Sequence, residues 1–205
     1  MLKNRKNVLI ALWIIAISLG FHTLLRYKGK AASSGQPPST WPRNEFISLS
    51  ANKPLLVMFA HPRCPCTKAS LAELEQLVEI AKTQFEAAVL FYEPKESSKA
   101  WSNTPLIDEA RLIPGLRVIL DRDGELAKRF VVETSGHTLL YSPDGDLLFT
   151  GGITACRGHL GDNLGLAAVS RIIAKPSIRW GRTSTPVFGC ELFTQCTKNQ
   201  TPSRN

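Results

Sequence analysis

Two apolar runs separated by one amphipathic segment constrain the fold of this chain more than any other feature. The runs PLLVMFA (residues 54–60) and AAVLFYE (87–93) are short and continuously apolar, as expected for strands buried on both faces of a sheet. Between them, residues 71–81 repeat apolar side chains at three- and four-residue spacing, which predicts an amphipathic helix. Two such strands joined by a helix form a βαβ unit, so we expect an α/β sheet.

The rest of the chain extends this sheet. The residue patterns predict a helix at 106–113, a strand at 116–121 and a short helix at 124–130. HTLLYS and DLLFTGG then flank Pro143-Asp144-Gly145, which predicts an antiparallel hairpin. A last amphipathic helix follows within 161–175, with Asp162 or Asn163 as its N-cap. This order predicts a mixed sheet with helices on both faces.

Composition argues for a folded protein and against one class of partner. Of the 205 residues, 43% are hydrophobic and 20% charged, which is the balance of a core-forming chain. The formal net charge is +8, but lysine and arginine are spread along the chain and thicken mainly at its ends. Because no basic run is interleaved with aromatic residues, we expect no nucleic-acid partner.

The N-terminal segment predicts a membrane anchor. Residues 8–25 carry no charged side chain and are followed by Arg26, Lys28 and Lys30. A helix needs about 20 apolar residues to cross the hydrocarbon core, so this one can span it. A cleaved signal peptide has a shorter apolar core followed by a small-residue site, and here the lysines crowd the only candidate, residues 31–33. We therefore expect an uncleaved single-pass helix that contacts the membrane through residues 8–25.

Four segments follow from these patterns. Residues 1–28 form the membrane anchor, and residues 29–44, rich in Gly, Ser and Pro, form a flexible linker. Residues 45–175 form the folded domain. Residues 176–205 form a C-terminal tail that carries Cys190 and Cys196.

The stretch HPRCPCT lies where the first strand should meet the first helix. Cys64 and Cys66 straddle the expected helix start, and Pro65 suits its first turn. Unpaired backbone N–H groups and the positive end of the helix dipole favour a thiolate there. Arg63 and Lys68 add positive charge that would lower the thiol pKa further. At least one nucleophilic sulfur is therefore expected, whereas a lone buried cysteine more often serves as a small hydrophobe.

The element order and the stretch LLVMFAHPRCPC resemble the thioredoxin-like superfamily, in particular its membrane-tethered TlpA-like proteins. In their pattern V-x-F-W-A-S-W-C-P-x-C, Phe59, Cys64 and Pro65 occupy matching positions. The resemblance implies a thioredoxin-like fold and makes Cys64 the attacking cysteine. The second cysteine of that pattern would fall at Thr67, but here it comes one position early, at Cys66.

A closer resemblance is to the RedB-like proteins of the same superfamily. Their motifs HPxCPCT, TSGxTLLY, GGITxxRGHxGDN and TPVFGC occur in that order at residues 61–67, 134–141, 151–163 and 185–190. Thioredoxin-like folds usually place a cis-proline just before the hairpin, where it shapes the surface that accepts a partner's cysteine. That position falls at Gly136 here, which implies a different surface.

The first functional hypothesis is thiol-disulfide exchange, the activity of an oxidoreductase. Cys64 would attack a disulfide of a protein or a small molecule, and Cys66 or the more distant Cys190 would resolve the mixed disulfide. Cys190 lies on a tail that could fold back, although a Cys190–Cys196 disulfide remains an alternative. This chemistry requires no cofactor.

The second hypothesis is a copper site, and the third is a non-catalytic tethered interaction module. His61, Cys64 and Cys66 offer one imidazole and two thiolates, and His137 is expected beside them. Soft sulfur ligands with histidine suit Cu(I), as in a periplasmic copper-binding or copper-delivery protein, and the design is similar to that of tethered Sco-type chaperones. Because disulfides form and persist in oxidising compartments, a thiol redox domain is expected to face the periplasm from a bacterial inner membrane, with the N-terminus inside.

Overall fold

The computed structural model describes residues 2–43, 46–81, 83–96, 101–176, 178 and 180–193. The chain divides into two compact units, Met1–Lys30 and Ala31–Asn205. The first contains a single helix, α1 (Leu2–Gly29). Its part Arg5–Gly29 is long and apolar enough to cross a membrane, by length and composition. This N-terminal helix is therefore a candidate anchor or signal segment.

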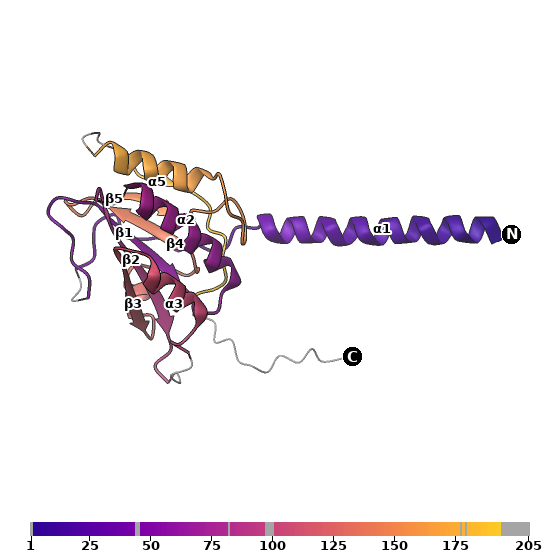
Figure 1. Cartoon of the computed structure of the whole chain (residues 1–205), viewed down its shortest axis with the longest axis horizontal. Helices are drawn as coiled ribbons and strands as arrows, with labels where there is room; N and C mark the ends of the chain where they lie inside the picture. The colour runs from indigo at the N-terminus through magenta and orange to yellow at the C-terminus, as the bar shows by residue number, and fades with distance from the viewer. Residues whose placement is uncertain are drawn as a thin grey trace. The chain divides into compact units, whose positions relative to one another are not determined.

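The second unit is built on a six-stranded mixed sheet with strand order β3-β2-β1-β4-β5-β6, most of which can be followed in Figure 1. β1, β2 and β3 run parallel, β4 pairs antiparallel with β1, and β5 pairs antiparallel with β4. The predicted βαβ unit and hairpin are therefore confirmed. The strands are β1 (Leu55–Ala60), β2 (Glu86–Glu93), β3 (Leu116–Arg122), β4 (His137–Tyr141), β5 (Leu147–Gly151) and β6 (Thr183–Ser184).

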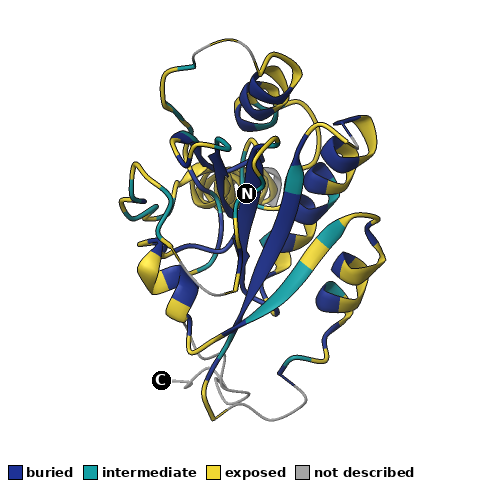
Figure 2. Ribbon diagram, turned by 90° about the vertical axis from the view of Figure 1, so that its left-hand side faces the viewer, coloured by how far each residue is buried: buried dark blue, intermediate teal, exposed yellow. Residues whose placement is uncertain are grey.

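Helices cover both faces of this sheet. The helices are α2 (Pro65–Ala81), α3 (Pro105–Leu112), α4 (Glu125–Arg129) and α5 (Leu164–Ala174). Apolar residues of α2, α3 and α5 pack with Leu56 and Met58 of β1, whereas α4 packs on the opposite face with Val57 and Phe59. Since successive strand side chains alternate between faces, β1 is buried throughout, and the central strands are dark blue in Figure 2.

Residues 31–43 differ from the flexible linker predicted for residues 29–44. They belong to the same compact unit as the sheet. The ring of Trp41 packs edge-on against Phe130 and Tyr141, with centroid distances of 5.0 and 5.1 Å. A composition rich in Gly, Ser and Pro correctly indicates that no helix or long strand forms here, but it does not exclude packing against the domain. The folded unit therefore begins before residue 45.

Candidate functional site

Three cysteines meet beyond the C-terminal end of β1. Cys64 precedes α2, Cys66 lies in its first turn, and Cys190 comes from the C-terminal segment. The Sγ atoms of Cys64 and Cys190 are 2.8 Å apart, and all three sulfur atoms lie within 4.8 Å of one another. Cys64 is 2% exposed, whereas Cys66 and Cys190 are half-buried. The site is therefore a compact sulfur cluster that is partly open to solvent.

Backbone pairing holds Cys190 in this position. Residues 190–192 run beside residues 133–135, where Ser135 N donates to Cys190 O at 2.9 Å and Leu192 N donates to Glu133 O at 2.8 Å. Of the tail predicted for residues 176–205, the segment 180–193 thus folds back onto the domain, while Cys196 lies outside the described residues. The sequence offered Cys190 as a candidate, and the structure brings it to Cys64.

Gly136 stands where the family resemblance places a cis-proline. Its φ is 86°, a left-handed conformation that glycine adopts readily and that the ring of proline forbids. Its N–H also donates to Phe59 O at 2.7 Å, a bond that proline could not make. Glycine is therefore required by the backbone here, and the loop that faces Cys64 has its own geometry.

A chain of hydrogen bonds leads to the sulfur of Cys64. Ser135 Oγ accepts from His61 N at 2.8 Å and lies 2.6 Å from Thr67 Oγ1. With the Ser135 hydroxyl donating to Thr67, the Thr67 hydroxyl is free to donate to Cys64, which lowers the pKa of that thiol. Sequence reasoning did not identify Thr67 or Ser135 as site residues. The one available signal was that Thr67 takes the place of the second cysteine in the TlpA-like pattern.

The three sulfur atoms differ in acidity. The hydrogen bond from Cys190 is the largest influence on Cys64 and, with the help of Thr67 and against the effect of burial, lowers its pKa to about 4. The same hydrogen bond raises the pKa of Cys190. Burial, followed by the nearby charge of Cys64, raises the pKa of Cys66. Cys64 is therefore the thiolate of the cluster, and the other two carry protons.

The cations that the sequence suggested for this role are engaged elsewhere. The guanidinium of Arg63 lies over the Trp101 ring, 4.5 Å from its centroid. Lys68 forms an exposed ion pair with Glu109 at 3.1 Å. Arg157 is the cation that acts on the cluster, because its charge opposes the rise in the pKa of Cys66 and its Nη1 donates to Gly189 O.

The two histidines proposed as metal ligands lie apart from the sulfur cluster. His61 packs edge-on against Trp101 at 5.4 Å between ring centroids, and its Nδ1 accepts from Arg63 N. His137 is fully buried in β4, where its Nε2 is 2.8 Å from Thr150 Oγ1 and burial lowers its pKa to about 4. Within the described part of the chain, the group with ligand spacing holds three cysteines and no histidine. The predicted set of two histidines and two cysteines is therefore not assembled.

Alkylation of Cys64 in the reduced protein is expected to depend little on pH between about 6 and 8. Its lowered pKa keeps Cys64 ionised throughout this range, and the rate should fall only on acidification toward that pKa. An ordinary cysteine, with a pKa of about 8.5, would instead react about tenfold faster per pH unit in the lower half of the range. Iodoacetamide labelling, read by peptide fragmentation that separates Cys64 from Cys66, measures the profile. A tenfold rise at Cys64 between pH 6 and 7 would contradict the assignment.

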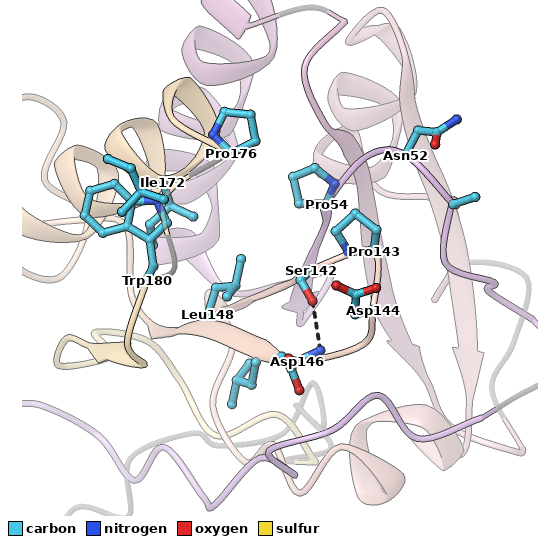
Figure 3. A pocket seen from close by; sticks show the side chains of 13 residues that line it. Asn52, Pro54, Ser142, Pro143, Asp144, Asp146, Leu148, Ile172, Pro176 and Trp180 are labelled. Atoms are coloured by element: carbon cyan, nitrogen blue, oxygen red, sulfur yellow. Dashed lines mark hydrogen bonds between the residues drawn. The ribbon is translucent and has the colours of Figure 1, made fainter.

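A pocket lies at the opposite end of β1, where Pro54 precedes the strand (Figure 3). Its volume is about 980 Å³, and its walls include the β4–β5 turn and the region after α5, with Asp144 and Trp180 among the lining residues. None of the described residues that line it is a cysteine or a histidine. This pocket is therefore separate from the sulfur chemistry.

No family model matches the sequence, and no curated protein matches it. Solved structures do resemble the fold. An uncharacterized conserved protein from Geobacillus kaustophilus aligns with a TM-score of 0.61 and 14% identity over 82% of this chain and 94% of that one. A hypothetical protein from Sinorhizobium meliloti aligns with a TM-score of 0.57 and 18% identity over 83% and 99%. At these identities the likeness concerns the fold alone.

Solved structures of proteins with a named activity align with this chain at lower TM-scores. A secreted disulfide oxidoreductase from Mycobacterium tuberculosis, homologous to E. coli DsbE, aligns with a TM-score of 0.43 and 16% identity over 60% of this chain and 81% of that one. Membership of the RedB-like group remains a prediction. The strand order β3-β2-β1-β4-β5, with three parallel strands, an antiparallel hairpin and flanking helices, is that of a thioredoxin-like fold.

Proposed function

We propose that this chain is a thiol-disulfide oxidoreductase in which Cys64 and Cys190 form the exchanging pair. The observation that supports this most directly is the distance of 2.8 Å between their Sγ atoms, which come from segments far apart in the sequence. A second sulfur held so close can attack a disulfide on the first without rearrangement of the backbone, which replaces an encounter in solution by an intramolecular step.

The proposed reaction begins at the Cys64 thiolate. It attacks one sulfur of a substrate disulfide, so that a mixed disulfide forms and the other substrate sulfur leaves as a thiolate. Cys190 then loses its proton to solvent and attacks Cys64 Sγ. The Cys64–Cys190 disulfide forms, and the second substrate sulfur leaves. Two electrons thus pass from the two cysteines to the substrate, and the reverse sequence oxidises a dithiol.

Cys190 is a better resolving cysteine than Cys66. A disulfide across Cys64-Pro65-Cys66 would close a small ring between residues that are fixed at a helix start, whereas disulfides require a specific geometry. Cys190 approaches instead from a separate segment that is held by backbone bonds to residues 133–135. The pairing across the two segments therefore supports a Cys64–Cys190 disulfide over a Cys64–Cys66 one.

The segment that carries Cys190 also affects which class of substrate can bind. Residues 190–192 occupy the backbone groups beside Gly136, where thioredoxin-like proteins usually accept a partner's cysteine. A protein substrate would have to displace them, whereas a small disulfide would have to pass only the half-buried Cys66 and Cys190 to reach Cys64, which is itself 2% exposed. We therefore favour small disulfides or thiols as substrates, with protein partners next.

An extracytoplasmic location fits this chemistry. A disulfide persists in an oxidising compartment, and we propose that α1 tethers the domain to the bacterial inner membrane with its N-terminus inside and the domain in the periplasm. The proposal therefore combines a single-pass anchor with a periplasmic redox domain that needs no cofactor.

Replacement of Cys190 by serine is expected to trap the mixed disulfide. The reduced full-length chain in detergent is mixed with oxidised glutathione, and intact mass is followed. The parent chain should gain an internal disulfide and retain no glutathione, because Cys190 expels it, whereas Cys190→Ser should retain glutathione on Cys64. Cys156→Ser is the matched control and should behave as the parent, since Cys156 lies outside the sulfur group. Identical products from the parent and from Cys190→Ser would refute Cys190 as the resolving cysteine.

A further inference from the structure

We propose that the reduced cluster also binds one Cu(I) ion through three sulfur ligands, Cys64, Cys66 and Cys190, without a histidine. This goes beyond the proposed function, because binding a metal ion transfers no electrons to a substrate. It also uses Cys66, which takes no part in the proposed exchange reaction. It also replaces the ligand set expected from the sequence, in which two histidines took part.

The distances support a common ion. The three Sγ atoms lie within 4.8 Å of one another and come from two segments that meet at the start of α2. Metal–sulfur bonds of about 2.3 Å in a trigonal plane place sulfur atoms about 4 Å apart. Cys64 and Cys190, now 2.8 Å apart, would therefore separate by about 1 Å to admit the ion. No ligand has to be brought from another part of the domain.

The chemical type and the number of the ligands determine which metal ion the cluster favours. Thiolates are soft ligands that bind Cu(I) and also zinc, but zinc prefers four tetrahedral ligands, so at three cysteines it would have to add a water molecule as its fourth ligand. Among the described residues, no further cysteine, histidine or carboxylate joins this group. His61 accepts from Arg63 N, and His137 hydrogen-bonds to Thr150 on β5. A three-coordinate, soft, monovalent ion therefore fits better than zinc.

Arg157 provides charge compensation. Binding of the ion displaces the protons of Cys66 and Cys190 into solvent. The resulting three thiolates around one monovalent cation leave a net charge of about −2 at the site, which is costly in a half-buried position. The guanidinium of Arg157 interacts with Cys66 and also donates to Gly189 O, next to Cys190. It thus stabilises the negative charge and fixes two ligand segments relative to each other, as outer partners of metal sites commonly do.

Copper binding and disulfide formation exclude each other. A Cys64–Cys190 disulfide removes two of the three ligands, so only the reduced chain can hold the ion. The ion in turn blocks the thiolate that begins exchange. The cluster would therefore hold copper only while it is reduced.

The test is a Cu(I) titration of the reduced full-length chain in detergent, without oxygen, against the chelator bathocuproine disulfonate. We expect one ion per chain and an X-ray absorption spectrum with only sulfur bound to copper. Cys66→Ser should weaken binding more than about 100-fold, since removing a direct ligand should exceed the 10–100-fold cost typical of outer partners. His61→Ala, His137→Ala and Cys156→Ser should bind as the parent does.

Three results would overturn the proposal: no binding in competition with the chelator, nitrogen bound to copper in the spectrum, or unchanged affinity in Cys66→Ser. The reaction with oxidised glutathione distinguishes failure of the copper proposal from failure of the proposed function. Cys66→Ser should still form the Cys64–Cys190 disulfide, so loss of copper with retained exchange isolates the metal site. A parent chain that exchanges disulfides but binds no copper refutes the metal site alone.

Discussion

Cys64→Ser is expected to abolish the fast reaction of this protein with disulfides. A serine hydroxyl does not attack disulfides at neutral pH. The substitution removes the hydrogen bond to Cys64 that most raises the pKa of Cys190, but burial also raises the pKa of Cys190 and of Cys66 and persists in the variant, so neither sulfur replaces the lost thiolate. Mixing the reduced full-length chain with oxidised glutathione and counting the remaining thiols over time measures the reaction. The fast phase should be absent in the variant.

Cys156→Ser is the matched control for this experiment. Cys156 is half-buried, as Cys66 and Cys190 are, but it lies outside the sulfur group. Its replacement should therefore leave the fast phase intact. Equal rates for the two variants would show that the reactive thiol is not Cys64.

Gly189→Ala is expected to slow closure of the Cys64–Cys190 disulfide by about 100-fold, the typical cost of misplacing a reacting group by about 1 Å. A Cβ atom at this position would lie 1.8 Å from the carbonyl oxygen of Ser135, so the segment that carries Cys190 must move away from Cys64. The lifetime of the glutathione mixed disulfide on Cys64, measured by rapid quenching and intact mass, reports this step directly. Initial attack by Cys64 should change much less.

Gly181→Ala is the control for Gly189→Ala. It lies in the same C-terminal region, but a Cβ atom there meets nothing within 4 Å. Its mixed disulfide should be as short-lived as that of the parent chain, and thermal unfolding of both variants shows whether the fold is retained. If Gly189→Ala folds and closes the disulfide at the parent rate, docking of this segment does not position Cys190.

The sheet could be predicted from the sequence because its central strands are buried on both faces. Continuous apolar runs at β1 and β2, with a helical stripe between them, leave few alternatives to a βαβ unit. The Pro143-Asp144-Gly145 turn likewise specified the β4–β5 hairpin. Asn163, one of the two predicted caps, accepts from Leu166 N at 2.7 Å at the start of α5.

The segment before the domain could not be predicted because composition describes local conformation and not contacts. Gly, Ser and Pro exclude regular structure in residues 31–43, yet Tyr141 Oη donates to Pro38 O at 2.9 Å, and Trp41 packs beside that ring. A single tryptophan in a polar stretch gives no sign of the surface it will cover. Such packing depends on tertiary structure.

The candidate site was predictable where it depends on neighbours in sequence. Cys64 lies directly before α2 and Pro65 opens the helix, as the local pattern indicated. The proximity of Cys190 to Cys64 joins residues 126 positions apart, and no local pattern reports such a contact. His137 lies one residue beyond Gly136, but the fold turns its ring to Thr150 on β5 and away from the sulfur atoms.

Disulfide mapping of the oxidised full-length chain tests the central claim most directly. Trypsin releases residues 64–68, which hold Cys64 and Cys66, and residues 183–198, which hold Cys190 and Cys196. After oxidation by glutathione, we predict that these two peptides are joined and that fragmentation assigns the bond to Cys64 and Cys190. A disulfide closed within residues 64–68, or one between Cys190 and Cys196 with Cys64 left free, would contradict the account.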